Sequence, residues 1–156
     1  MTLPSVRIVE DDLSGLEIGA LLRLHLAEAH ANSPPGLAFA FDIDRLRAPD
    51  VTFWSMWDGD TLAGCAALKE LAPDHGEIKS MRTSPDHLRK GVAARMIEHL
   101  ITVSRRRGYG KLSLETGSTP AYQPALALYT HYGFTEGEQF GGYTPSDFNR
   151  FFHLAL

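Results

Sequence analysis

Cysteine pairs, long apolar runs and an excess of positive charge are all missing from this 156-residue sequence. Its single cysteine, Cys65, cannot form an intrachain disulfide, so nothing implies an oxidising compartment, and the small apolar residues around it favour a buried thiol over a nucleophile. No apolar run approaches the ~20 residues that a membrane span needs, and the N-terminus lacks the basic-then-apolar profile of a signal peptide. We therefore expect a cytoplasmic protein without a membrane partner.

The charge balance is acidic rather than basic: 15 Lys and Arg face 19 Asp and Glu, for a net charge of −4. A general nucleic-acid binder usually carries a basic face and a high pI, so nucleic acid is not an expected partner. The run from Arg105 to Arg107 is better explained by its place near the C-terminus of a predicted helix, where cations interact favourably with the helix dipole. No pair among the seven histidines has metal-ligand spacing with a carboxylate, so we expect no metal.

The length and pattern of the chain predict one domain, residues 1–156, because no repeat, low-complexity tract or long linker divides it. The helix over 92–107 is the clearest element, with apolar residues along one face and polar residues along the other. Strands are expected at 6–9, 51–57, 61–71, 77–83, 111–116, 134–143 and 148–156, and helices at 16–30, 43–47, 92–107 and 120–132. This order indicates a mixed α/β domain.

The segment from Arg82 to Ala93 joins a predicted strand to that helix and carries features of a phosphate site. A helix begins with unpaired N–H groups and a partial positive charge, which suit a phosphate. Gly91 and Ala93 keep side-chain bulk away from those amides, and Arg89 and Lys90 add positive charge. The segment is neither a Walker loop nor a Rossmann fingerprint. On these local features alone, an exposed helix start without a ligand explains the pattern equally well.

Two longer motifs resemble those of a known family. Residues 77–85 followed by Arg89-Lys90-Gly91-Val92-Ala93 resemble the acetyl-CoA motif of the GNAT superfamily of N-acetyltransferases, and 125–134 resembles its second motif, Ala-x-x-Leu-Tyr-x-x-x-Gly-Phe. The order of elements also matches, so the resemblance covers essentially the whole chain. It implies a single α/β (α+β) domain with a central, mixed, mostly antiparallel twisted sheet flanked by helices. It also implies acetyl-CoA as cosubstrate and no metal.

The resemblance assigns roles in cofactor binding residue by residue. The backbone of Met81 and Thr83 would pair with the pantetheine arm as an added strand would. The diphosphate would lie on the amides of residues 89–93. Leu88 stands where the family usually has Arg or Gln, so one side-chain contact is missing, and Arg89 could replace it. The residues so assigned to the cofactor are Met81, Arg82, Thr83, Leu88, Arg89, Lys90, Gly91, Val92, Ala93 and Tyr129.

In the reaction that the resemblance implies, an amine attacks the thioester directly. The protein must then supply a neutral amine, a polarised carbonyl and a proton for the departing thiolate. By family position Tyr129 is the acid and Tyr132 a packing residue, while a strand N–H near Met81 would stabilise the developing oxyanion. Glu77 would act as base through a water molecule, and Glu115, with Thr116, could bind the acceptor's ammonium group. Both carboxylates are equally explained as solvated residues at strand ends.

The function that we predict is transfer of an acetyl group from acetyl-CoA to a primary amine of a small molecule. Two alternatives stay open: acetylation of a protein or peptide amine, and a non-catalytic acyl-CoA sensor. In the family, substrate choice depends on segments that correspond here to 29–41 and 140–148. A homodimer would suit the apolar residues Phe151 and Phe152, although a buried last strand explains them as well.

Overall fold

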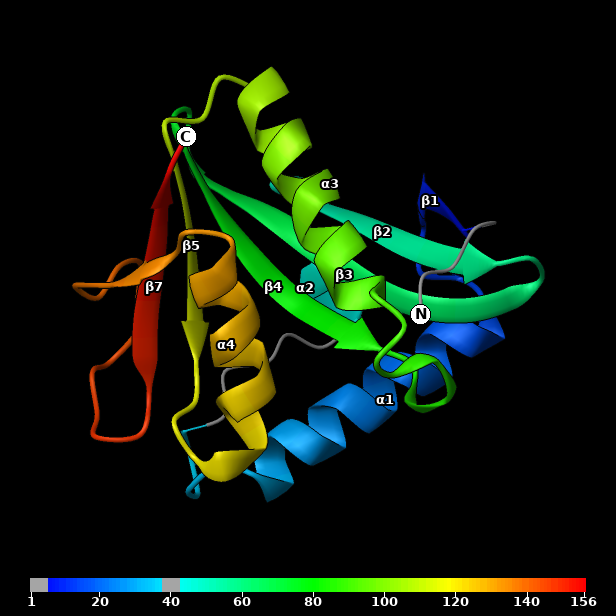
Figure 1. The fold of residues 1–156 in the computed structure, drawn as a ribbon, viewed down its shortest axis with the longest axis horizontal. Coiled ribbons are helices and arrows are strands. Elements are labelled where there is room, and N and C mark those ends of the chain that lie inside the picture. Colours follow the sequence, from blue (N-terminus) through cyan, green and yellow to red (C-terminus); the bar gives the residue numbers. More distant parts are fainter. Residues whose placement is uncertain (1–5, 38–42) are drawn as a thin grey trace.

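The computed structural model describes residues 6–37 and 43–156. Seven strands form one sheet in the order β1-β2-β3-β4-β5-β7-β6, in which every neighbouring pair is antiparallel except the parallel pair β4 and β5 (Figure 1). The strands are β1 (Val6–Glu10), β2 (Val51–Asp58), β3 (Thr61–Ala72), β4 (His75–Thr83), β5 (Lys111–Thr116), β6 (Thr135–Glu136) and β7 (Arg150–Ala155). The helices are α1 (Leu16–Ala31), α2 (Ile43–Leu46), α3 (Val92–Arg106) and α4 (Gln123–His131), with single 3-10 turns at η1 (Pro85–His87) and η2 (Pro120–Tyr122).

Two hydrophobic cores lie on opposite faces of this sheet. Side chains alternate along a strand, so in β3 Ala66 and Leu68 pack with α3 and α4, whereas Cys65 and Ala67 pack with α1 and α2. Figure 1 shows α3 and α4 in front of the sheet. Cys65 is 1% exposed, and burial raises the pKa of its thiol to about 12, as a structural thiol requires. Among the described residues, no helix has the length and apolar character that a bilayer crossing requires.

The feature that positions the site is the separation of β4 from β5. The two strands pair only where 75–77 meets 111–113, after which β4 follows β3 and β5 follows β7. A bulge in β4 accompanies this divergence: Cys65 faces Arg82 and Ala67 faces Lys79, so two β4 residues oppose Ala66. Bulges bend a strand and increase its twist. Figure 1 shows β4 and β5 meeting near the C-terminus and spreading apart toward α1.

The structure corrects the sequence prediction in three segments, of which the first two are 134–143 and 120–132. The strand predicted over 134–143 is wrong, because only Thr135–Glu136 joins the sheet and the chain then turns through Gly141 at a φ of 59°. Phe140 leaves the ladder to stack against Phe151 at a ring distance of 5.8 Å. The helix predicted over 120–132 divides into η2 and α4, and Pro124, which has no N–H to donate, lies in the first turn of α4.

The last strand begins later than expected, at Arg150, because 146–149 forms a turn in which the Ser146 N–H donates to Asn149 Oδ1 at 2.7 Å. Within β7, Phe151 and Phe152 are 6% and 8% exposed. They therefore pack inside the chain and give no independent support for an interface between copies. The predicted homodimer stays a prediction.

Candidate active site

A cavity of about 330 Å³ lies where β4 and β5 separate. It brings together side chains from β4, β5 and α4, with α1 and the loop that precedes β7 completing its walls. Five of the residues predicted to form the site line it: Met81, Arg82, Glu115, Thr116 and Tyr129. The segment 88–93 is not part of this lining and lies at the start of α3 instead.

The start of α3 fits a diphosphate. Arg89 and Gly91 both adopt left-handed backbone, with φ values of 62° and 83°. Gly91 caps the helix without any side-chain hydrogen bond, and the first turn contains no acidic residue. A Cβ built on Gly91 would meet nothing within 4 Å, so open space adjoins the first amides of the helix. Unpaired N–H groups beside open space are compatible with an anion there, and the assignment of a diphosphate to residues 89–93 stays a prediction.

Glycine is also required where α3 approaches the sheet. A Cβ on Gly64 would lie 2.8 Å from Val92 Cγ1 and 2.9 Å from the Arg82 carbonyl oxygen, which is too close for any real contact. Gly64 therefore allows the first turn of α3 to pack directly on β3. The Leu88 side chain is 58% exposed, so the position where the family has Arg or Gln contributes an apolar surface and no polar contact.

Tyr129 reaches the cavity from α4. It is 7% exposed, and burial raises its pKa to about 12, so the hydroxyl keeps its proton at neutral pH. Its ring packs against that of Phe134 at 5.8 Å, which fixes its orientation. Tyr132 is not part of the cavity lining: its hydroxyl donates to Glu98 Oε2 at 3.0 Å, and its ring packs against the core.

The two candidate carboxylates occupy different environments. Glu115 lines the cavity, and burial raises its pKa to about 7; the charge of Glu77 adds to this effect, and that of Lys79 opposes it. Glu77 is 3% exposed and is not part of the lining. Its carboxylate accepts a hydrogen bond from the Tyr143 hydroxyl and lies 3.7 Å from Lys79 Nζ, and both of those side chains line the cavity. The cavity is therefore open to Glu115, whereas Glu77 lies behind Tyr143 and Lys79.

The sequence from 18 to 134 matches the family model for the acetyltransferase (GNAT) family. This chain belongs to the GNAT family. It is 51% identical over 133 residues to the uncharacterized N-acetyltransferase YsnE of Bacillus subtilis (strain 168), covering 85% of this chain and 88% of YsnE. It is 42% identical over 149 residues to the uncharacterized N-acetyltransferase YedL of Escherichia coli (strain K12), covering 96% and 94% of the two chains.

The fold of this GNAT chain is also similar to the crystal structure of a Bacillus subtilis acetyltransferase in complex with CoA. The two superpose with a TM-score of 0.74 over 97% of this chain and 99% of that one, at 19% sequence identity. The resemblance and the fold class inferred from the sequence are thus confirmed. Family membership supports an acyltransferase activity. In the described part of the GNAT chain, no cluster of three or more His, Cys, Asp or Glu residues could bind a metal ion.

The predicted specificity segment 29–41 includes the end of α1, and Ala29, Asn32 and Ser33 line the cavity, but sequence reasoning missed the preceding turn of this helix. Arg82 Nη1 lies 2.5 Å from Glu28 Oε2, a pair that ties α1 to the cofactor strand. His25, one turn earlier, also lines the cavity, and burial lowers its pKa to about 4, so it is neutral at physiological pH. The two residues lie three apart on one helix face, but only tertiary packing reveals that this face meets Arg82. Residues 38–41 of the predicted specificity segment 29–41 lie outside the described residues.

The end of α1 also contacts the other elements that line the GNAT cavity. Ser33 Oγ and the Tyr122 hydroxyl are 3.1 Å apart, and Thr119 Oγ1 donates to the Asn32 carbonyl at 3.1 Å. Phe148 packs edge-on against Tyr122 at 5.7 Å. These contacts join α1, η2 and the turn before β7 into one wall.

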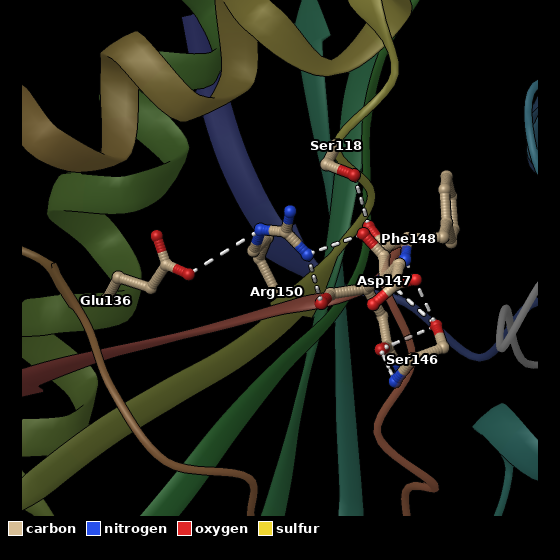
Figure 2. Close-up of polar contacts among 7 residues, drawn as sticks. Ser118, Glu136, Ser146, Asp147, Phe148 and Arg150 are labelled. Carbon is tan, nitrogen blue, oxygen red and sulfur yellow. Dashed lines mark hydrogen bonds and ion pairs between the residues drawn. The ribbon is translucent and has the colours of Figure 1, made fainter.

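Polar contacts fix Phe148 in that wall (Figure 2). Ser118 Oγ donates to the Phe148 carbonyl at 2.6 Å, and Arg150 Nη1 donates to the Asp147 carbonyl at 2.8 Å. On its other side Arg150 reaches toward Glu136, with Nε 3.6 Å from Oε2 (Figure 2). The turn that carries Phe148 is therefore anchored to β6 and to the segment that follows β5.

Proposed function

We propose that this chain transfers the acetyl group of acetyl-CoA to a primary amine of a small molecule, by direct attack of the amine on the thioester. One observation carries the proposal: the cavity at the separation of β4 and β5 is lined both by Glu115, with a pKa of about 7, and by Tyr129, with a pKa of about 12. A carboxylate that is ionised near neutral pH can accept a proton, while a phenol that keeps its proton can donate one. The two roles that the reaction needs thus fall on two elements, β5 and α4, that line one cavity.

The cosubstrate would be bound by the backbone of two elements. The edge of β4 beyond Glu77 has no partner in β5, so the N–H and C=O groups of Met81 and Thr83 can pair with the amides of a pantetheine arm. The amides of 89–93 would receive the diphosphate. Bound in this way, acetyl-CoA would supply an activated acyl group, with its thioester directed into the cavity between the two strands.

Glu115 would act as the base. As the amine nitrogen forms its bond to the carbonyl carbon it becomes acidic, and the Glu115 carboxylate accepts the proton that it loses. The bond between carbon and sulfur then breaks, and Tyr129 donates its proton to the departing thiolate. The products are an N-acetylated amine and free CoA.

Glu77 would have a supporting role in this mechanism. The sequence predicted it as the base, but it does not line the cavity, and the Tyr143 hydroxyl donates to its carboxylate, which also lies 3.7 Å from Lys79 Nζ. We assign Glu77 to holding Tyr143 and Lys79 in the cavity wall. Replacing Glu77 with Gln should therefore leave a pH-dependent enzyme with reduced activity, whereas replacing Glu115 with Gln should abolish the acidic limb of the pH profile.

The size and closure of the site support a compact acceptor. A volume of about 330 Å³ must hold the acetyl group together with the acceptor, and it lies near the lower end for ligand pockets. The contacts of Asn32 and Ser33 with Thr119 and Tyr122 hold the end of α1 beside η2 at the cavity. A protein or peptide amine would need an open groove, and these contacts favour a smaller acceptor.

The test is an assay of thiol release from acetyl-CoA with a panel of small primary amines and a peptide with a free N-terminus. We expect turnover with at least one small amine, loss of turnover in Glu115→Gln, and normal turnover in Glu10→Gln, an exposed carboxylate on β1. Turnover with the peptide alone would shift the acceptor class to proteins. Thermal stabilisation by acetyl-CoA without thiol release from any amine would indicate a sensor.

A further inference from the structure

The cavity is lined from both faces of the sheet. On one face, Tyr129 on α4 belongs to the core that contains α3 and α4. On the other face, α1 packs against the second core and lines the cavity with Glu28. Side chains alternate along β5, and Leu114 belongs to the core of α3 and α4, so Glu115 points to the face of α1. Since Tyr129 would meet the sulfur on its own face, the side of α1 and Glu115 is the acceptor side.

The charged side chains on this acceptor side are already paired, with one exception. Among the described residues, the charged groups in the cavity lining are Glu28, Lys79, Arg82 and Glu115. Arg82 Nη1 lies 2.5 Å from Glu28 Oε2, and Lys79 Nζ lies 3.7 Å from Glu77 Oε2. None of the ion pairs of the described chain includes Glu115. The acceptor side therefore contains two neutral pairs and one carboxylate without a cation.

Neither cation can bind an acidic group without a cost to its partner. Glu77 and Lys79 are 3% and 7% exposed, and a buried charge that loses its partner is strongly destabilising. The hydrogen bond that Arg82 donates lowers the pKa of Glu28, so that carboxylate stays ionised and keeps its claim on Arg82. His25 supplies no further cation, because burial and the charge of Arg82 lower its pKa to about 4.

An acidic group on the acceptor would also lie close to Glu115. In an α-amino acid the carboxylate is bonded to the carbon that carries the amine, so an amine that reaches Glu115 brings the carboxylate with it. Two carboxylates repel each other, and more strongly where burial limits screening by water. A neutral substituent at the same position has no such cost. The charges of the site thus distinguish among small amines.

We propose that the acceptor is a primary amine without a carboxylate or phosphate group, and that the pairing of Arg82 with Glu28 enforces this choice. The inference rests on the proposed function, because it assumes that the cavity binds the acceptor of an acetyl transfer. Glu28 is then a specificity-determining residue that acts through Arg82: it neutralises the cation that would otherwise attract an acidic acceptor.

The test compares acceptors that share one carbon skeleton. One series is 2-phenylethylamine, phenylalaninamide and phenylalanine, and a shorter series is ethylamine, alaninamide and alanine. Within each series the carboxamide and the carboxylate have nearly the same size, so they differ chiefly in charge. In the thiol-release assay we expect the wild-type kcat/KM of the amine and of the carboxamide to exceed that of the amino acid about tenfold or more. The same comparison is made for any other amine that the panel of small amines identifies.

Glu28→Gln tests the assigned cause. Gln keeps a hydrogen-bond acceptor for Arg82 but removes the negative charge, so kcat/KM of the amino acid relative to the amine should rise about fivefold or more. The intrinsic reactivity of each compound cancels, because the ratio is compared between two proteins. Glu17→Gln is the matched control: Glu17 is an exposed carboxylate on α1, outside the cavity lining, and its loss should leave the ratio unchanged. A purely structural pair would change all acceptors of a series alike.

The outcomes separate this inference from the proposed function. A wild type that acetylates the amino acid as well as the parent amine, or a Glu28→Gln variant with the wild-type ratio, would overturn the inference and leave the transferase intact. Thiol release from none of the small amines would overturn the proposed function, and the inference with it.

Discussion

Gly117, which follows β5, tests how closely the acceptor side of the cavity is packed. Replacing it with alanine adds a Cβ that would lie 2.4 Å from Phe148 Cζ and 2.5 Å from Tyr122 Cε2, whereas ordinary contact begins near 3.4 Å. One or both rings would have to move by roughly 1 Å, since atoms this close repel steeply. Both rings line the cavity, so this movement changes the shape of the acceptor site. Overpacking of this kind costs about 1–3 kcal/mol.

The expected result of Gly117→Ala is a change in acceptor binding with little change in cosubstrate binding. If acceptor binding has to overcome this overpacking energy of about 1–3 kcal/mol, the KM for the acceptor rises about fivefold or more. The Kd of acetyl-CoA should change less than about twofold, because the substitution does not alter the start of α3. Gly142→Ala is the matched control: its Cβ would meet nothing within 4 Å, and its φ is not in the left-handed region. The reasoning is refuted if the two variants give the same KM, or if Gly117→Ala weakens acetyl-CoA and leaves the acceptor unaffected.

Four further predictions concern three side chains, those of Glu115, Tyr129 and Ser80. Wild-type kcat/KM should rise with pH through about 7, where Glu115 ionises, and Glu115→Gln should lose that limb. Burial raises the folded-state pKa of Glu115 above its ordinary value of 4.5, so the ionised carboxylate destabilises the folded state. Glu115→Gln should therefore stabilise the fold by about 1–3 kcal/mol above pH 7, where Glu115 is ionised. Thermal unfolding scans should show no such difference below pH 4.5, where Glu115 is protonated in both the folded and unfolded states. Tyr129→Phe should lower turnover about tenfold or more in the thiol assay while calorimetry finds acetyl-CoA binding intact, and normal turnover would remove Tyr129 from the mechanism. Ser80→Gly should unfold at higher urea than Ser80→Ala, by about 1 kcal/mol in stability, since only glycine relieves the positive φ; equal midpoints would mean that the bulge is not strained.

Local pattern was sufficient to predict the elements that carry the proposed cosubstrate site. The helix after Gly91 has apolar residues at helical spacing over four turns, and the small residues before it exclude side-chain bulk, so both the element and its exposed amides follow from adjacent residues. Tyr129 and Gly133 likewise belong to one short motif on α4 and its end. Features encoded within a few neighbouring residues could thus be predicted without knowledge of tertiary contacts.

The acceptor half could not be predicted in the same way, because its geometry depends on contacts between distant segments. Glu77 and Glu115 look alike in sequence, each in a strand, and only the folded chain places Tyr143 over one of them. The prediction of a strand over 134–143 failed because only Thr135–Glu136 pairs with β7, while Phe140 packs edge-on against the ring of Phe151. The unsatisfied hydroxyl of Ser80 is also invisible until the bulge is seen.

Glu77 and Glu115 have different partners, and the contacts of Glu77 affect the pKa of Glu115. Burial raises the pKa of Glu77 and Glu115 alike, and the charge of Lys79 lowers both. Glu77 lies 3.7 Å from Lys79 and accepts the Tyr143 hydrogen bond, so its negative charge is compensated. That engagement limits how far Lys79 can stabilise the ionised form of Glu115, whose pKa therefore stays near neutrality, where a proton acceptor works best. On this argument, loss of the Glu77 charge should shift the acidic limb of the pH profile downward, because Lys79 would then act on Glu115 alone.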